Sequence, residues 1–122
     1  MAVKKVLVID DSSFVRLSTT LHLQRAGYKV VALESAVGAT TVLRAEKPDL
    51  VLLDLNMPGL EGDEFLTIIR GLGIDTKVLL YSAAEPFELE MAALESGADG
   101  FLQKCAPEAL VKAIDSWLRP GR

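Results

Sequence analysis

The chain has 122 residues, enough for one domain that buries a core without disulfides or a structural metal. Half of the residues are apolar and a quarter are charged, and the formal net charge of −4 argues against the basic surface that nucleic-acid binding needs. The single cysteine, Cys105, excludes an internal disulfide, and no apolar run approaches the roughly 18 residues of a membrane span. We therefore expect one soluble, cytoplasmic domain with no direct nucleic-acid or membrane partner.

Short apolar runs alternate with stretches of helical spacing along the chain. The runs predict strands at residues 5–9, 28–33, 50–55, 77–82 and 100–104. Breaks containing Gly or Pro close the intervening helices at 26–28, 47–49, 70–73 and 96–100, and the last helix is expected to stop at Pro120. Five strand–helix units in succession favour an α/β fold, in which a parallel sheet carries helices on both faces.

Charged and hydroxyl side chains close four of these strands. They are Asp10 and Asp11 after the first, Asp54 in the third, Ser82 in the fourth and Lys104 in the fifth. In an open α/β sheet, ligands bind beyond the carboxyl ends of the strands. Right-handed crossovers place the first, third and fourth strands side by side, so the three aspartates should converge. Their mutual repulsion predicts a bound divalent cation, most simply Mg²⁺.

The combination of motifs identifies a family. The pair "DD" and the stretches "LLDLNMPGLEG", "LLYSA" and "GADGFLQK" resemble the receiver domain of bacterial two-component response regulators over essentially the whole chain. The spacings of 43, 28 and 22 residues from Asp11 to Asp54, Ser82 and Lys104 match that pattern. The resemblance implies a doubly wound, flavodoxin-like sheet of order 2-1-3-4-5 with five helices. It also implies a single receiver domain over residues 1–122 with no output domain; whether the chain stands alone or is cut from a longer regulator stays open.

The resemblance assigns roles to the strand-end residues. Asp54 would accept a phosphoryl group from a sensor histidine kinase or a histidine phosphotransfer protein, and an ionised carboxylate needs no base to act as a nucleophile. Mg²⁺ would be held by Asp11, Asp54 and the backbone carbonyl of Asn56, with Asp10 acting through water. Lys104 would place a positive charge on a phosphate oxygen.

A hydroxyl and an aromatic ring would form the switch. Ser82 corresponds to the family's switch hydroxyl and Phe101 to its switch aromatic, although Phe101 lacks the phenol of the commoner Tyr. One departure concerns the residue after Lys104, where the family usually has proline, often in a cis bond. Cys105 stands there instead, and the sequence leaves a cis and a trans Lys104–Cys105 peptide open.

Two apolar rows on predicted helices suggest binding surfaces. Phe14, Leu17 and Leu21 lie away from the presumed core face of the first helix, and the family's kinases dock at that helix. Partial burial against the last helix or the following loop is the alternative.

In "EPFELEMAALESGADG" (85–100), a second apolar row lies opposite the face that should pack on the sheet. This row, formed by Phe87, Met91 and Leu94, is predicted to bind a downstream protein or to form a homodimer, together with the strand at 100–104 and the last helix. Coverage by a neighbouring loop is the alternative.

Other functions fit the sequence less well. A phosphatase of the haloacid-dehalogenase type needs an acid two residues after its nucleophile, where this chain has Asn56. In a flavodoxin-like FMN protein, Asp10 and Asp11 would repel the phosphate. The remaining alternative is a pseudo-receiver that is not phosphorylated and acts only as a binding module. A receiver catalyses only its own phosphorylation and dephosphorylation, so we do not expect a conventional enzyme.

Overall fold

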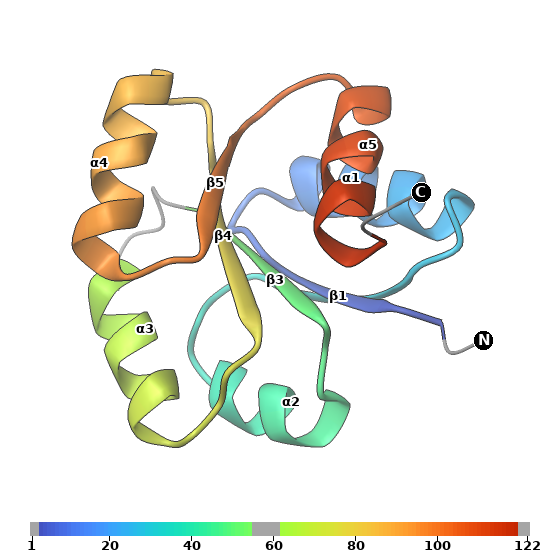
Figure 1. The fold of residues 1–122 in the computed structure, drawn as a ribbon. Helices are drawn as coiled ribbons and strands as arrows, with labels where there is room; N and C mark the ends of the chain where they lie inside the picture. The colour runs from blue at the N-terminus through green and yellow to red at the C-terminus, as the bar shows by residue number, and fades with distance from the viewer. Residues whose placement is uncertain (1–2, 55–61, 120–122) are drawn as a thin grey trace.

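The computed structural model describes residues 3–54 and 62–119 and shows five strands alternating with five helices (Figure 1). The strands are β1 (Lys5–Ile9), β2 (Lys29–Leu33), β3 (Leu50–Asp54), β4 (Lys77–Ser82) and β5 (Gly100–Gln103). The helices are α1 (Ser13–Arg25), α2 (Ala39–Glu46), α3 (Gly62–Gly71), α4 (Pro86–Ser96) and α5 (Pro107–Leu118). All five predicted strands are present, and β1 and β4 have the predicted bounds.

The strands form one parallel sheet in the order β2-β1-β3-β4-β5. This order confirms the doubly wound, flavodoxin-like fold. Because every strand pair is parallel, the carboxyl ends of all five strands lie at one edge of the sheet. The end of β1 therefore lies beside the end of β3, although 43 residues separate Asp11 from Asp54.

Helices cover both faces of the sheet (Figure 1). One buried cluster joins the sheet to α2, α3 and α4, and a second joins it to α1 and α5. Alternate residues of each central strand enter opposite clusters; in β1, Leu7 and Ile9 face the first and Val6 and Val8 face the second. Burial on both faces explains why the central strands read as unbroken apolar runs.

Two element ends differ slightly from the prediction, and two further predicted ends lie outside the described residues. β2 begins one residue later than expected because the amide of Tyr28 donates to the carbonyl of Leu23 and so closes the end of α1. β5 ends at Gln103, although the amide of Lys104 still donates to the carbonyl of Ser82 at 2.7 Å. β3 is described as far as Asp54 and α5 ends at Leu118; the predicted ends at Leu55 and Pro120 lie outside the described residues.

α4 has clear start and stop signals. Pro86 occupies its first turn, where a missing N–H costs nothing. Gly97 follows the helix with φ +80°, a left-handed conformation that favours glycine, and its amide donates to the carbonyl of Ala93. Across the described ranges, no helix has the length and apolar character needed to span a bilayer.

Candidate functional site

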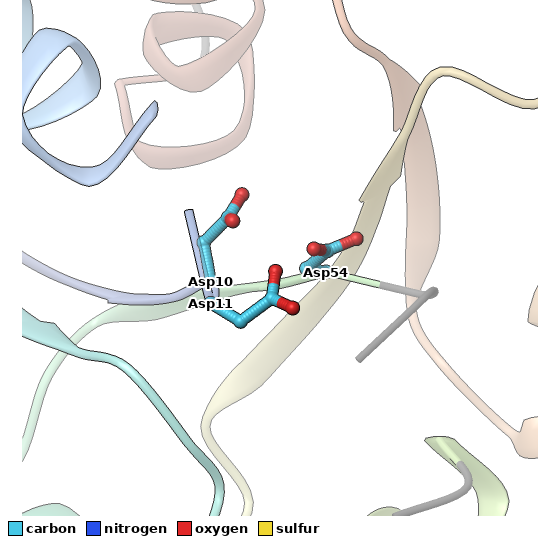
Figure 2. A group of neighbouring side chains, drawn as sticks. All are labelled: Asp10, Asp11 and Asp54. Atoms are coloured by element: carbon cyan, nitrogen blue, oxygen red, sulfur yellow. The ribbon is translucent and has the colours of Figure 1, made fainter. Parts of the chain in front are cut away.

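Three aspartates meet at the carboxyl edge of the sheet, as the sequence predicted. Figure 2 shows Asp10 and Asp11 at the end of β1 beside Asp54 at the end of β3. One carboxylate oxygen from each residue lies within 4.8 Å of those from the other two. Asp10 and Asp54 are buried, whereas Asp11 is exposed, so the cluster opens to solvent on the Asp11 side.

The turn from β1 into α1 orients Asp10. Its Oδ1 accepts a hydrogen bond from the amide of Ser12 at 2.9 Å, and the Ser12 hydroxyl in turn caps α1 by accepting from the amide of Val15 at 3.2 Å. The guanidinium of Arg16 donates to the backbone carbonyl of Asp10 at 2.7 Å. Ser12 therefore both caps the helix and fixes the direction of the Asp10 carboxylate.

Lys104 brings a positive charge to this edge. Its Nζ lies 3.2 Å from Oδ2 of Asp10 and 4.0 Å from Oδ2 of Asp54. Oδ2 of Asp10 is buried and receives no aligned hydrogen bond from any residue that the structure describes, so its contact with Lys104 is ionic. The ammonium also lies 5.7 Å from the centre of the Tyr81 ring, within the range of a cation–π contact.

Tyr81 is a neutral neighbour of this cluster. Burial raises the pKa of its phenol to about 12, and the nearby charges of Cys105 and Asp10 act in the same direction. Burial of part of its surface also raises the pKa of the Cys105 thiol, although the residue as a whole is exposed. The Lys104–Cys105 peptide is trans, as are the other peptide bonds within the described ranges, which settles the alternative that the sequence left open.

The donor set fits a hard divalent cation. Carboxylate oxygens are the ligands that Mg²⁺ prefers, at about 2.1 Å, so ligands on opposite sides of the ion lie about 4.2 Å apart. Three carboxylate oxygens within 4.8 Å need only small rotations to reach that spacing. The Oδ2 of Asp10, buried without an aligned hydrogen bond from a described residue, provides a further acceptor for a cation or for its bound water. Asn56, the other predicted ligand, lies outside the described residues.

Two side chains form hydrogen bonds with the backbone of the segment after β4. The Ser82 hydroxyl, fully buried, accepts from the amide of Ala84 at 3.1 Å. The side-chain amide of Gln103 donates to the carbonyl of Ala84 at 3.1 Å. Phe101 is half-buried against the cluster that joins the sheet to α2, α3 and α4. Both polar groups of the Ala84 backbone are therefore held by side chains, one from β4 and one from β5.

Comparison with known proteins identifies the family. The model of the response regulator receiver domain matches residues 6–115. The chain belongs to this family. Response regulator MprA of Mycobacterium tuberculosis is 34% identical over 116 residues, which are 94% of this chain and 50% of MprA. The chain thus spans about half the length of the curated relatives it matches.

Solved receivers have the same fold. The chemotaxis protein CheY4 of Vibrio cholerae aligns with a TM-score of 0.84 and 31% identity, covering 93% of this receiver and 98% of that chain. The receiver domain of the response regulator NarL of Mycobacterium tuberculosis aligns with a TM-score of 0.85 and 30% identity over 100% of both chains. A receiver domain is not a conventional enzyme.

Both apolar rows predicted on the receiver's helices are exposed. On α1, Phe14, Leu17 and Leu21 are 78%, 61% and 41% exposed. On α4, Phe87, Met91 and Leu94 are 72%, 41% and 73% exposed. Leu21 and Met91 are the partly covered members of the two rows, and the fully buried residues are Thr19 and Leu23 on α1 and Leu89 and Ala93 on α4.

Three contacts around the site were not predicted from the sequence. Arg16 binds the Asp10 carbonyl, Tyr81 places its ring beside the Lys104 ammonium, and Gln103 holds the Ala84 carbonyl. The third contact could have been predicted, because Gln103 stands beside Lys104 at the end of β5 and that strand end lies next to the end of β4.

Proposed function

We propose that this receiver takes a phosphoryl group from a phosphohistidine of a sensor histidine kinase, or of a histidine phosphotransfer protein, onto Asp54. The observation that carries the proposal is the position of the Asp54 carboxylate at the sheet edge, close to two further carboxylates and 4.0 Å from a lysine ammonium. Receiver domains typically work in the cytoplasm, and that is the compartment we propose.

The Asp54 carboxylate is suited to the role of nucleophile. One of its oxygens attacks phosphorus, the bond from phosphorus to the donor's histidine nitrogen breaks, and the imidazole leaves as the P–O bond forms. Since the carboxylate is ionised at neutral pH, no general base is required. The work left to the protein is to align the two groups and to neutralise charge on the transferring oxygens.

Two positive charges are proposed to neutralise those oxygens. Lys104, already between Asp10 and Asp54, needs only a short movement to contact a phosphoryl group on Asp54. Asp11 and Asp54, with Asp10 through water and the carbonyl of Asn56, would hold Mg²⁺, which withdraws electron density from the phosphoryl oxygens when it is bound.

Ser82 and Phe101 are proposed to transmit the signal. The Ser82 hydroxyl accepts from the amide of Ala84 and keeps its own O–H, which can donate to a phosphoryl group on Asp54; rotation of the side chain toward that group would stretch the contact with Ala84. The segment leading into α4 then moves, and the half-buried Phe101 turns further inward. The surface of α4, β5 and α5, including Phe87, Met91 and Leu94, would then bind a downstream protein or a second copy of the chain.

Labelling with acetyl phosphate tests the proposal. In the presence of Mg²⁺, the mass of the chain should increase by one phosphoryl group, and Asp54→Asn should abolish the increase. Removing Mg²⁺ with a chelator should also prevent labelling. A chain that is never labelled, although it binds Mg²⁺ and is folded, would instead be a pseudo-receiver that acts only by binding.

A further inference from the structure

The negative charge of the chain is concentrated around α4. Five of the 17 acidic residues and none of the 13 basic residues lie between Val78 and Gln103, so this stretch has a formal charge of −5. The whole chain has a net charge of −4, and the remainder is therefore slightly positive. Of the five acids, Asp99 is paired with Arg70 at 3.0 Å. The other four are Glu85, Glu88, Glu90 and Glu95.

These four glutamates are exposed and have no basic neighbour on their own helix. None of them forms an ion pair with another residue in the described part of the chain. Glu95 lies in the last turn of α4, where a negative charge opposes the helix dipole, and that turn contains no basic residue. Glu85 and Glu88 lie at the N-terminal end of α4, where negative charge favours the helix dipole, so helix stability leaves only the charges of Glu90 and Glu95 without an explanation.

The same helix exposes a row of large apolar side chains. Phe87, Met91 and Leu94 are spaced by four and three residues, so they line one stripe of the helix. The inward stripe is formed by Leu89 and Ala93, which are buried in the core. The exposed stripe and the four glutamates together form what we call the acidic α4 face.

The negative charge of the acidic α4 face discriminates among possible binding partners. A symmetric contact between two α4 helices would bring the same four glutamates of each copy together, which like-charge repulsion opposes. Nucleic acid and anionic lipid would be repelled for the same reason. A basic partner that also offers apolar side chains complements both properties of the face.

We propose that the acidic α4 face binds an amphipathic helix of a partner protein, with apolar residues at helical spacing and Lys or Arg on their flanks. The apolar stripe supplies the buried contact and the glutamates select a basic partner. The inference rests on the proposed function, since it names the partner of the surface through which phosphorylation would act.

Two synthetic peptides test the preference. Both carry the same apolar helical pattern, one with lysine and the other with glutamate at the flanking positions, and binding to the full chain is measured by fluorescence anisotropy. We expect the lysine peptide alone to bind, with an affinity that falls several-fold between about 50 and about 300 mM salt. Met91→Lys should weaken its binding about tenfold, and Glu90→Lys with Glu95→Lys should weaken it and reduce the salt dependence. Val3→Lys, at a 54% exposed apolar residue before β1, is the matched control.

Several results would overturn the inference. Equal binding of the two peptides, no binding of either, or binding that Met91→Lys leaves unchanged would each contradict it. Dimerisation in sedimentation experiments that Met91→Lys abolishes would show that the occupant is a second copy. Each chain is also labelled with acetyl phosphate in parallel. Normal labelling without peptide binding refutes this inference alone, whereas failed labelling of a folded chain refutes the proposed function.

Discussion

The ammonium nitrogen of Lys104 lies 3.2 Å from the buried Oδ2 of Asp10. The same nitrogen lies 4.0 Å from Asp54, so one lysine faces two of the three clustered carboxylates. A divalent cation would neutralise the same charges. Lysine and cation are therefore expected to substitute for each other in part.

Replacing Lys104 with methionine tests this overlap. In Mg²⁺-free buffer, Lys104→Met should lower the free energy of unfolding by about 1–2 kcal/mol, because Asp10 stays buried without its partner; the partial exposure of the lysine limits the loss. Adding Mg²⁺ should raise the Tm of the variant more than that of the wild type. Thermal denaturation with and without Mg²⁺ measures both effects, and Lys112→Met on the exposed side of α5 is the control. If Mg²⁺ raises the Tm of both proteins equally, Lys104 and the cation do not substitute for each other.

The exposed row on α1 is expected to bind the kinase. Leu17 is 61% exposed, so Leu17→Glu should change the Tm by no more than a degree or two. Transfer from the cognate kinase should fall, because the substitution places a charge within Phe14, Leu17 and Leu21. Labelling by acetyl phosphate, which needs no docking, should stay normal. If both reactions decline together, the row has no specific role in docking.

The hydrogen bond from Gln103 to the carbonyl of Ala84 is expected to oppose the switch. Gln103→Leu removes the donor at similar size and should free the segment after Ser82, so that its hydroxyl turns toward Asp54 more readily. An exposed hydrogen bond contributes about 0.5–1 kcal/mol, which corresponds to about two- to fivefold tighter binding of the phosphoryl mimic beryllofluoride. Titration of both proteins measures the ratio, with Gln24→Leu on α1 as the matched control. Unchanged or weaker binding would show that Gln103 does not restrain this segment.

Gly100 leaves room for the only tryptophan. A Cβ at this position would lie 2.7 Å from Cζ2 of Trp117 and 3.1 Å from Cδ2 of Leu79. Gly100→Ala should therefore lower the free energy of unfolding by about 1–3 kcal/mol and shift the Trp117 fluorescence to the red as the ring moves outward. Gly71→Ala is the matched control, since a Cβ there meets nothing within 4 Å. An unchanged emission spectrum in Gly100→Ala would show that the ring does not depend on this glycine.

The single cysteine allows a direct pH test. Burial raises the pKa of the Cys105 thiol above its ordinary value of 9.0, so less thiolate is present at pH 8 in the folded chain than in the unfolded chain. Alkylation by iodoacetamide should be slower in the native state, with its midpoint at higher pH than in urea. The unfolded state loses this proton first, so the thiol's contribution to stability is complete below pH 9 and declines as pH rises through the folded pKa. Equal midpoints in native and unfolded chains would contradict the shift.

The order of elements and the identity of the candidate site could be predicted from the sequence. Asp10, Asp11, Asp54, Ser82 and Lys104 each close an apolar run, and parallel strands bring such residues to one edge whatever their separation along the chain. The stripe of Phe87, Met91 and Leu94 was also predictable, since helical periodicity alone separates it from Leu89 and Ala93.

Only the tertiary structure decided how the side chains at that edge pair. Lys104 has a long, flexible side chain, and its contact with Asp10 depends on the direction that Ser12 gives to that carboxylate. The link from Gln103 to Ala84 depends on the register between β4 and β5, which fixes which strand-end residues are neighbours. Periodicity places a residue on a face of an element, whereas these contacts depend on distances of a few ångströms between elements, which no local pattern records.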